Sequence, residues 1–363
     1  MRSTSGAHFV ALDHIRAVAA VLVFTWHFTH GLTGMPVPFG TAPWLAFLDE
    51  GHVGVALFMT LSGYLFAKLL DGKRMLLSGF LLNRALRLLP LLVFVFLVHA
   101  AIQVVGARDF RQAYRFLLTL PQGLVYPTWP KGGWSITAEL HFYLLLPLLL
   151  ALQRRSAIWL VLILCISMTL RAVVFHYQPV QPAAYFTIVG RIDQFVLGIL
   201  AFHWRSPSHV WAAATALAFW AFYYTFDASG GFYGTTTSPI WVVMPLIEGA
   251  ALAVLIAWYD GNFSPSGSLS TAVAKVGEYS YSIYLLHPFV VFGAAKFIHT
   301  RVVDLSDFHL ASIVSLVAFT AMLPLGYLSM RFIEAPFLRR RRPYYIQPNR
   351  PATQSLDGGV AVP

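Results

Sequence analysis

Charged residues and cysteine are both scarce in this chain of 363 residues. Only 11% of the residues are charged, whereas soluble domains carry about a quarter. Cys165 is the single cysteine, which excludes an intramolecular disulfide framework and a thiolate metal site within one chain. The sequence also lacks a G-x-S-x-G elbow, a Walker loop and an H-E-x-x-H motif. These absences argue against the hydrolase, nucleotide-binding and zinc-peptidase classes that carry those motifs.

Apolar side chains are abundant, at 58% of the residues, and the mean hydropathy is +0.66. A soluble fold could not bury so much apolar surface, so the sequence predicts an all-α, polytopic transmembrane helical bundle. A membrane span needs about 20 apolar residues, and the sequence holds about ten such windows, near residues 10–31, 51–70, 80–105, 134–152, 156–176, 184–204, 209–226, 238–259, 277–299 and 310–333. The net charge of +10 fits basic cytoplasmic loops better than nucleic-acid binding.

The chain is predicted to consist of a membrane domain, residues 1–337, and a basic cytoplasmic tail, residues 338–363, disordered from Pro343. With both termini in the cytoplasm, most Lys and Arg fall on the inner side, which favours a multi-pass protein of the cytoplasmic (inner) membrane. The first apolar segment is expected to be a retained helix, because no clean cleavage site follows it. The longest connection, residues 107–133, is a candidate for an amphipathic helix.

The first predicted helix carries ionisable side chains along one face, in the segment HIRAVAAVLVFTWHF. Eleven residues at about 100° each place Arg16 and His27 on the same face, roughly 16 Å apart along the axis. Asp13, three residues before Arg16, is positioned to pair with it. Ionisable groups at such depth usually face a site or pathway, so we expect both side chains to face one passage through the protein. The structural alternative is that Arg16 extends to the lipid headgroups and His27 is a bundle histidine with satisfied hydrogen bonds.

Two further segments carry candidate functional residues. Arg84 and Arg87 in FLLNRALRLLP share a helix face and predict a phosphate clamp; a positive-inside anchor is an equally good interpretation. Glu139 in WSITAELHFYLLLP shares its face with Tyr143 and is a candidate to orient His27 or a substrate hydroxyl. An ion pair between Glu139 and Arg191 is the structural alternative.

Other polar side chains fall within the apolar windows, namely Ser62, Asp193, Glu248, Tyr284 and His287. Glu248 is costly at its depth, and the sequence names no partner for it. Glu334 is expected to pair with nearby arginines. The His-x4-Asp spacing in HTRVVD, residues 299–304, matches that of lipid-modifying acyltransferases, but it lies in a predicted outer loop and is interpreted as a chance match.

Together these segments resemble the acyltransferase-3 family of polytopic membrane acyltransferases. LDHIRAVAAVLVFTWHF, GVALFMTLSGYL, FLLNRALRLLP, WSITAELHFYLLLP, YSYSIYLLHP and FIEAPF are similar to family motifs and occur in the expected order, from Leu12 to Phe337. The chain departs from the pattern at Ala56, which replaces an Asp, and at Leu140 and His141, which replace Glu and Gln.

The resemblance implies transfer of an acyl group, commonly acetyl, from cytoplasmic acyl-CoA to a hydroxyl of a surface polysaccharide, a lipid-linked glycan or a glycosylated natural product. His27 is then expected to act as general base, with Glu139 and Tyr143 as further catalytic residues. Arg16, Arg84 and Arg87 would bind the coenzyme, and the substrate-binding candidates are Ser62, Arg191, Asp193 and His287. Tyr143, Ser62 and Arg16 are open candidates for the oxyanion donor, and no metal is expected.

Two other functions remain as alternatives at this point. A proton-coupled transporter of a polar or anionic solute would also need buried Arg, His, Glu and Asp, although no inverted repeat is visible. A partner or scaffold for a polysaccharide flippase would need none of these residues for chemistry. The acceptor, the acyl chain length and the oligomeric state are not fixed by the sequence.

Overall fold

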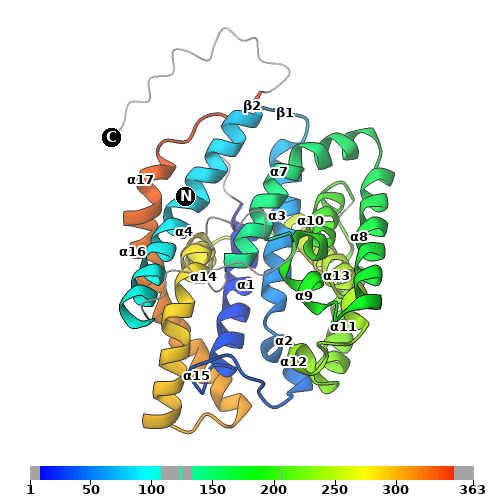
Figure 1. Ribbon diagram of the computed structural model, residues 1–363. Coiled ribbons are helices and arrows are strands. Elements are labelled where there is room, and N and C mark those ends of the chain that lie inside the picture. The colour runs from blue at the N-terminus through cyan, green and yellow to red at the C-terminus, as the bar shows by residue number, and fades with distance from the viewer. Residues whose placement is uncertain (1–8, 108–122, 125–132, 205, 347–363) are drawn as a thin grey trace.

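The protein is a bundle of long helices, described here from a computed structural model that covers residues 9–107, 123–124, 133–204 and 206–346 (Figure 1). The expected amphipathic helix within residues 107–133 falls almost entirely outside this described part of the chain.

Each of the ten apolar windows is helical along most of its length, so the predicted helical bundle is confirmed. Nine windows correspond to α1 (Val10–Thr29), α3 (Val53–Leu70), α4 (Leu77–Ala107), α7 (Gly133–Arg155), α8 (Ile158–Tyr177), α10 (Ile188–Phe202), α11 (His209–Ala228), α13 (Ile240–Asn262) and α14 (Ser268–Arg301). The last window is divided into α15 (Phe308–Thr320), α16 (Met322–Ser329), the π-helical turn η2 (Met330–Glu334) and α17 (Ala335–Leu338).

Short elements connect these helices. They are η1 (Pro43–Leu45), α2 (Ala46–Asp49), α9 (Gln181–Phe186), α12 (Gly231–Gly234) and two short strands, β1 (Arg74–Met75) and β2 (Tyr345–Ile346). In Figure 1, β1 and β2 lie at one end of the bundle, while α2 and α12 lie towards the other.

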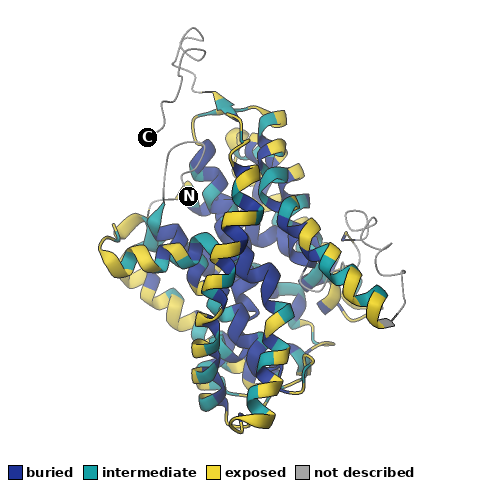
Figure 2. Cartoon of the chain, turned by 90° about the vertical axis from the view of Figure 1, so that its left-hand side faces the viewer, coloured by how far each residue is buried: buried dark blue, intermediate teal, exposed yellow. Residues whose placement is uncertain are grey.

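Eight segments of the described chain are long and apolar enough to cross a membrane. The remaining two, α10 and α11, do not meet that criterion, and α10 is short and buried along nearly all its length between α3, α7, α8 and α13. Figure 2 shows buried residues along the middle of the molecule and exposed residues on its outer faces. The outward face of α8 is apolar, with Ile158, Leu162, Ile166, Leu170 and Val173 all exposed. Such a continuous apolar surface fits contact with lipid.

Glycines allow the central helices to approach closely. A Cβ placed on Gly63 of α3 would lie 2.0 Å from the carbonyl oxygen of Phe195, and one on Gly198 of α10 would lie 2.0 Å from that of Thr60. A Cβ on Gly277 of α14 would likewise lie 1.9 Å from the carbonyl oxygen of Asp13 in α1. Small residues at such crossings are typical of membrane bundles, where tight packing stabilises helix contacts.

The prediction of disorder from Pro343 does not hold for residues 343–346, which belong to the packed structure. β2 pairs antiparallel with β1, with Arg74 opposite Ile346 and Met75 opposite Tyr345. Tyr344 is 1% exposed. The tail from residue 338 therefore begins as part of the packed structure, because its backbone pairs with the connection between α3 and α4.

Candidate functional site

A cavity of about 240 Å³ lies among α1, α3, α4, α7 and α14. Its lining includes Phe9 of the entry to α1, whose ring lies 4.5 Å from the Lys68 Nζ at the end of α3. The cavity therefore lies towards the end of the bundle where α3 ends and α4 begins. It brings together six of the ten predicted catalytic, coenzyme-binding and substrate-binding residues, namely Arg16, Ser62, Arg84, Arg87, Glu139 and Tyr143.

The predicted stripe on α1 is present. Arg16 lines the cavity and forms an ion pair with Asp13, which confirms the expected pairing. Its side chain is 30% exposed and lines the cavity. The same helix face packs on α14, where the ring of His27 lies 4.6 Å from the ring of His287.

Arg84 and Arg87 both face the cavity, but their surroundings differ. Arg87 forms an ion pair with Glu334 at 2.6 Å, as expected for that carboxylate. Arg84 instead lies over aromatic rings, with its guanidinium 5.1 Å from the centre of the Phe66 ring and 5.8 Å from that of Tyr143. Its Nε is buried and has no hydrogen-bond partner in the described part of the chain. Arg84 is therefore the better placed of the two to bind an anion from outside.

Glu139 and Tyr143 form a hydrogen bond one helical turn apart, in which the Tyr143 hydroxyl donates to the Glu139 carboxylate. Both line the cavity. The alternative ion pair with Arg191 is wrong, because Arg191 pairs with Glu248 at 3.2 Å. The pair thus presents a carboxylate and a phenol to the cavity from α7.

His27 is not among the described residues that line the cavity, so the expectation of one passage lined by both Arg16 and His27 is not met. The imidazole Nδ1 of His27 is hydrogen bonded to the carbonyl of Val23 at 2.8 Å. His287 is buried beside it, and its Nε2 has no hydrogen-bond partner among the described residues. The His287 ring lies 5.7 Å from that of Tyr284, which lines the cavity. His27 is therefore connected to the cavity through two intervening side chains.

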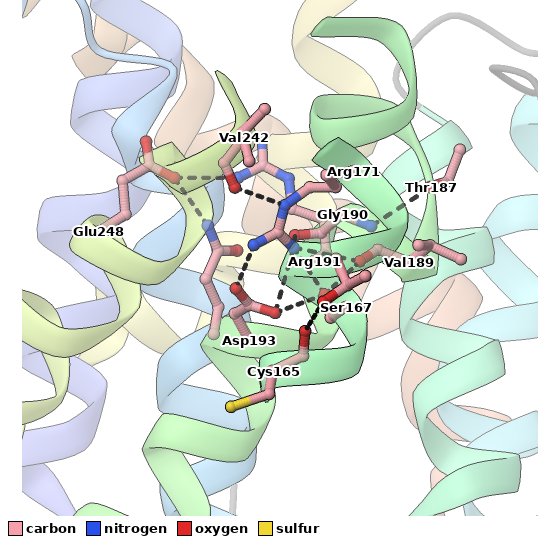
Figure 3. Close-up of polar contacts among 12 residues, drawn as sticks. Cys165, Ser167, Arg171, Thr187, Val189, Gly190, Arg191, Asp193, Val242 and Glu248 are labelled. Atoms are coloured by element: carbon pink, nitrogen blue, oxygen red, sulfur yellow. Dashed lines mark hydrogen bonds and ion pairs between the residues drawn. The ribbon is translucent and has the colours of Figure 1, made fainter. Parts of the chain in front are cut away.

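Arg191 and Asp193 lie outside the cavity lining and have protein partners (Figure 3). Asp193 pairs with Arg171 at 2.6 Å, and both side chains are fully buried. Arg191 and Gln194 both donate to Glu248, which supplies the partner that the sequence could not name. We interpret these groups as internal supports of the bundle, because a buried charge needs a partner and each has one. This revises the expectation that Arg191 and Asp193 bind substrate.

Sequence reasoning missed three residues that the structure places at these sites. Arg171 stands alone in the apolar stretch SMTLRAVVF, which was a usable signal for a buried ion pair. Arg341 and Tyr344 line the cavity, yet they lie in the tail that was predicted to be separate. Their sequence context, a run of four arginines, gave no signal for a role beyond a basic anchor.

The His299–Asp304 pair lies at the end of α14 and in the following loop, where the two side chains are 3.3 Å apart. Neither residue lines the cavity, which agrees with the interpretation as a chance match. Among the residues that the structure describes, no group of three or more His, Cys, Asp or Glu could hold a metal ion.

Comparison with known proteins gives a consistent picture. Residues 9–331 match a family described as an acyltransferase domain. Over 305 residues the chain is 27% identical to BcsY of Komagataeibacter xylinus, a protein named as a putative membrane-bound transacylase, and the alignment covers 76% of this chain and 71% of that protein. No solved structure matches the chain significantly. With the helical membrane bundle and this match over most of its length, the chain belongs to the acyltransferase-3 family and is a membrane acyltransferase.

Proposed function

We propose that the protein transfers an acyl group, most simply acetyl, from cytoplasmic acyl-CoA to a hydroxyl of a carbohydrate or glycoside acceptor. The observation that carries this proposal is the cavity, which combines four guanidinium groups with the hydrogen-bonded Glu139 carboxylate and Tyr143 phenol of α7. The acceptor class and the cytoplasmic origin of the donor follow the family resemblance and the charge distribution of the sequence.

The volume of the cavity is consistent with a thioester donor bound by its pantetheine arm. Pockets for compact drug-sized ligands measure about 300–1,000 Å³, and this cavity measures about 240 Å³. A pantetheine arm fits such a space, whereas the nucleotide would remain at the mouth. There Arg84 is available to bind phosphate, since guanidinium groups bind phosphate oxygens in a bidentate manner.

His27 is proposed as the general base. In the transfer step the acceptor oxygen loses its proton to the base and forms a bond to the thioester carbonyl carbon. The C–S bond then breaks, and coenzyme A leaves as the thiol after taking the proton from the protonated base. Because Tyr284 and His287 lie between His27 and the cavity, the proposal requires these two side chains to shift when acceptor binds. Ser135 donates a hydrogen bond of 2.7 Å to the Tyr284 hydroxyl and connects this layer to α7.

The test uses purified protein, acetyl-CoA labelled in the acetyl group and a set of glycoside acceptors. The wild-type protein is expected to release free coenzyme A and move the label to acceptor, and His27→Ala is expected to lower the rate by about 100-fold or more. His309→Ala, at an exposed position of α15, is the control and should retain full activity. Normal turnover by His27→Ala would refute the assigned role.

The alternative of proton-coupled transport predicts a different result in the same assay. A transporter would leave the thioester intact while moving a solute across reconstituted vesicles. Intact acetyl-CoA together with solute uptake would therefore replace the acyltransferase proposal.

A further inference from the structure

Four consecutive arginines, Arg339–Arg342, follow the last helix. As a sequence they are typical of a basic anchor on the cytoplasmic side of a span. In the structure Arg341 lines the cavity, whereas Arg339, Arg340 and Arg342 do not. Arg339 and Arg340 are exposed. Of these four arginines, Arg341 alone faces the cavity.

Arg341 is the first residue of a segment that we call the C-terminal strap, residues 341–346. The position of this backbone segment sets the orientation of the Arg341 side chain. The strap is tied to the start of α4 by two hydrogen bonds between the side chain of Asn83 and the main chain of Arg342, at 2.7 and 3.0 Å. The amide of Leu76 donates to the carbonyl of Tyr344 at 2.8 Å, and β2 pairs with β1. Because the strap is held at several points, the Arg341 side chain is directed into the cavity rather than into solvent.

Of the four arginines that line the cavity, two have ion-pair partners among the described residues and two do not. Arg16 has Asp13 and Arg87 has Glu334 as ion-pair partners. Arg84 and Arg341 form no ion pair in the described part of the chain, and the buried Nε atom of each has no hydrogen-bond partner there. Burial, followed by the positive charges of Arg84 and Arg87, lowers the pKa of Arg341 to about 10. Buried N–H donors without acceptors are costly, so this end of the cavity favours the binding of an anion.

Aromatic rings complete the site. The Tyr344 ring centre lies 5.9 Å from the Arg84 guanidinium, and the same guanidinium lies 5.7 Å from the centre of the Phe80 ring. Such rings hold a guanidinium in place without neutralising its charge. The rings therefore hold Arg84 in place as a cation facing the cavity.

We propose that Arg341, carried by the C-terminal strap, acts together with Arg84 to bind a phosphate group of the acyl-CoA donor. The proposal rests on the proposed function for the identity of the donor. Arg341 lies beyond residue 331, where the family match ends, so its role is drawn from this structure alone.

The experiment compares three acetyl donors: acetyl-CoA, its 3′-dephospho form, and S-acetylpantetheine, which has neither the nucleotide nor the diphosphate. Arg341→Gln is expected to raise KM for acetyl-CoA about tenfold or more, since it removes a charged hydrogen bond, and to leave KM for S-acetylpantetheine unchanged. If Arg341→Gln raises KM less for the 3′-dephospho donor than for acetyl-CoA, Arg341 binds the 3′-phosphate. If the rise in KM is the same for both donors, Arg341 binds the diphosphate. Arg340→Gln, an exposed neighbour, is the matched control and should behave as wild type, and Arg341→Lys should restore part of the affinity.

Two results would overturn the proposal. An equal rise in KM for S-acetylpantetheine would mean that the strap only shapes the cavity, and an unchanged KM for acetyl-CoA would mean that Arg341 does not contact the donor. A lipid phosphate is the other source of this chemistry: if it were the ligand, Arg341→Gln would abolish stimulation by phosphatidylglycerol in nanodiscs without distinguishing the three donors, which also contradicts donor binding.

A binding measurement tests the phosphate site independently of whether the protein transfers an acyl group. Calorimetric titration of coenzyme A into wild type, Arg341→Gln and Arg340→Gln needs no turnover. If the wild-type protein transfers no acyl group, the proposed function fails, but loss of coenzyme A binding in Arg341→Gln alone would still support the phosphate site. Equal binding to all three proteins would refute it.

Discussion

At the scale of single residues, Glu139 and Tyr143 present one hydrogen-bonded pair to the cavity. Each holds the other in place, because the phenol donates to the carboxylate one turn earlier on the same helix. Glu139→Gln and Tyr143→Phe are each expected to lower kcat about 100-fold. The double variant should lose little more than either single variant, because groups that act as a unit are not additive.

The measurement is acyl transfer by the two single variants and the double variant. Tyr327→Phe, at an exposed position of α16, removes a phenol hydroxyl outside the cavity lining and should leave kcat unchanged. Losses that multiply in the double variant would show that the two groups act independently.

At the scale of elements, the crossing of α3 and α10 depends on glycine. Gly198→Ala would place a Cβ 2.0 Å from the Thr60 carbonyl oxygen, so the two helices must separate. Overpacking of this kind costs about 1–3 kcal/mol. We expect a lower thermal midpoint for the purified Gly198→Ala protein.

The chain supplies its own control for this prediction. Gly293 lies in α14, and a Cβ added to it would meet no atom of a neighbouring element within 4 Å among the described residues. Alanine is the better helix former, so the thermal midpoint of Gly293→Ala should stay equal or rise slightly. Similar losses in both variants would show that the α3–α10 contact is not the cause.

At the scale of the whole molecule, the sequence predicts which end faces the cytoplasm. Ser156, between α7 and α8, follows Arg154 and Arg155 and is exposed, and Thr237, between α12 and α13, is exposed as well. The helix α12 lies towards the end of the bundle opposite β1 and β2 (Figure 1). In a Cys165→Ser background, which removes the single cysteine, Ser156→Cys and Thr237→Cys each introduce one label site.

A membrane-impermeant maleimide applied to intact cells is expected to label Thr237→Cys and not Ser156→Cys. Labelling after lysis should reach both. The reverse pattern in intact cells would place the basic end, the cavity mouth and the C-terminal strap outside, and it would exclude a cytoplasmic donor.

Apolar periodicity and length determined the helices of this protein. Every apolar window contains a helix because a chain in a bilayer must satisfy its backbone hydrogen bonds within each span. Local spacing also fixed the pairs within one helix, such as Asp13 with Arg16 and Glu139 with Tyr143, because residues three or four apart share a face.

Contacts between distant segments were decided only by the tertiary structure. Glu248 forms an ion pair with Arg191, and Asp193 forms one with Arg171. The segment after α17 packs against α4, which places Arg341 in the same cavity as Arg84. No spacing rule relates these positions, because the order in which helices pack is set by side-chain shape, close glycine contacts and the need of each buried charge for a partner. For the same reason the spacing of Arg16 and His27 on one helix predicted a shared passage, whereas in the folded molecule His287 and Tyr284 lie between His27 and the cavity.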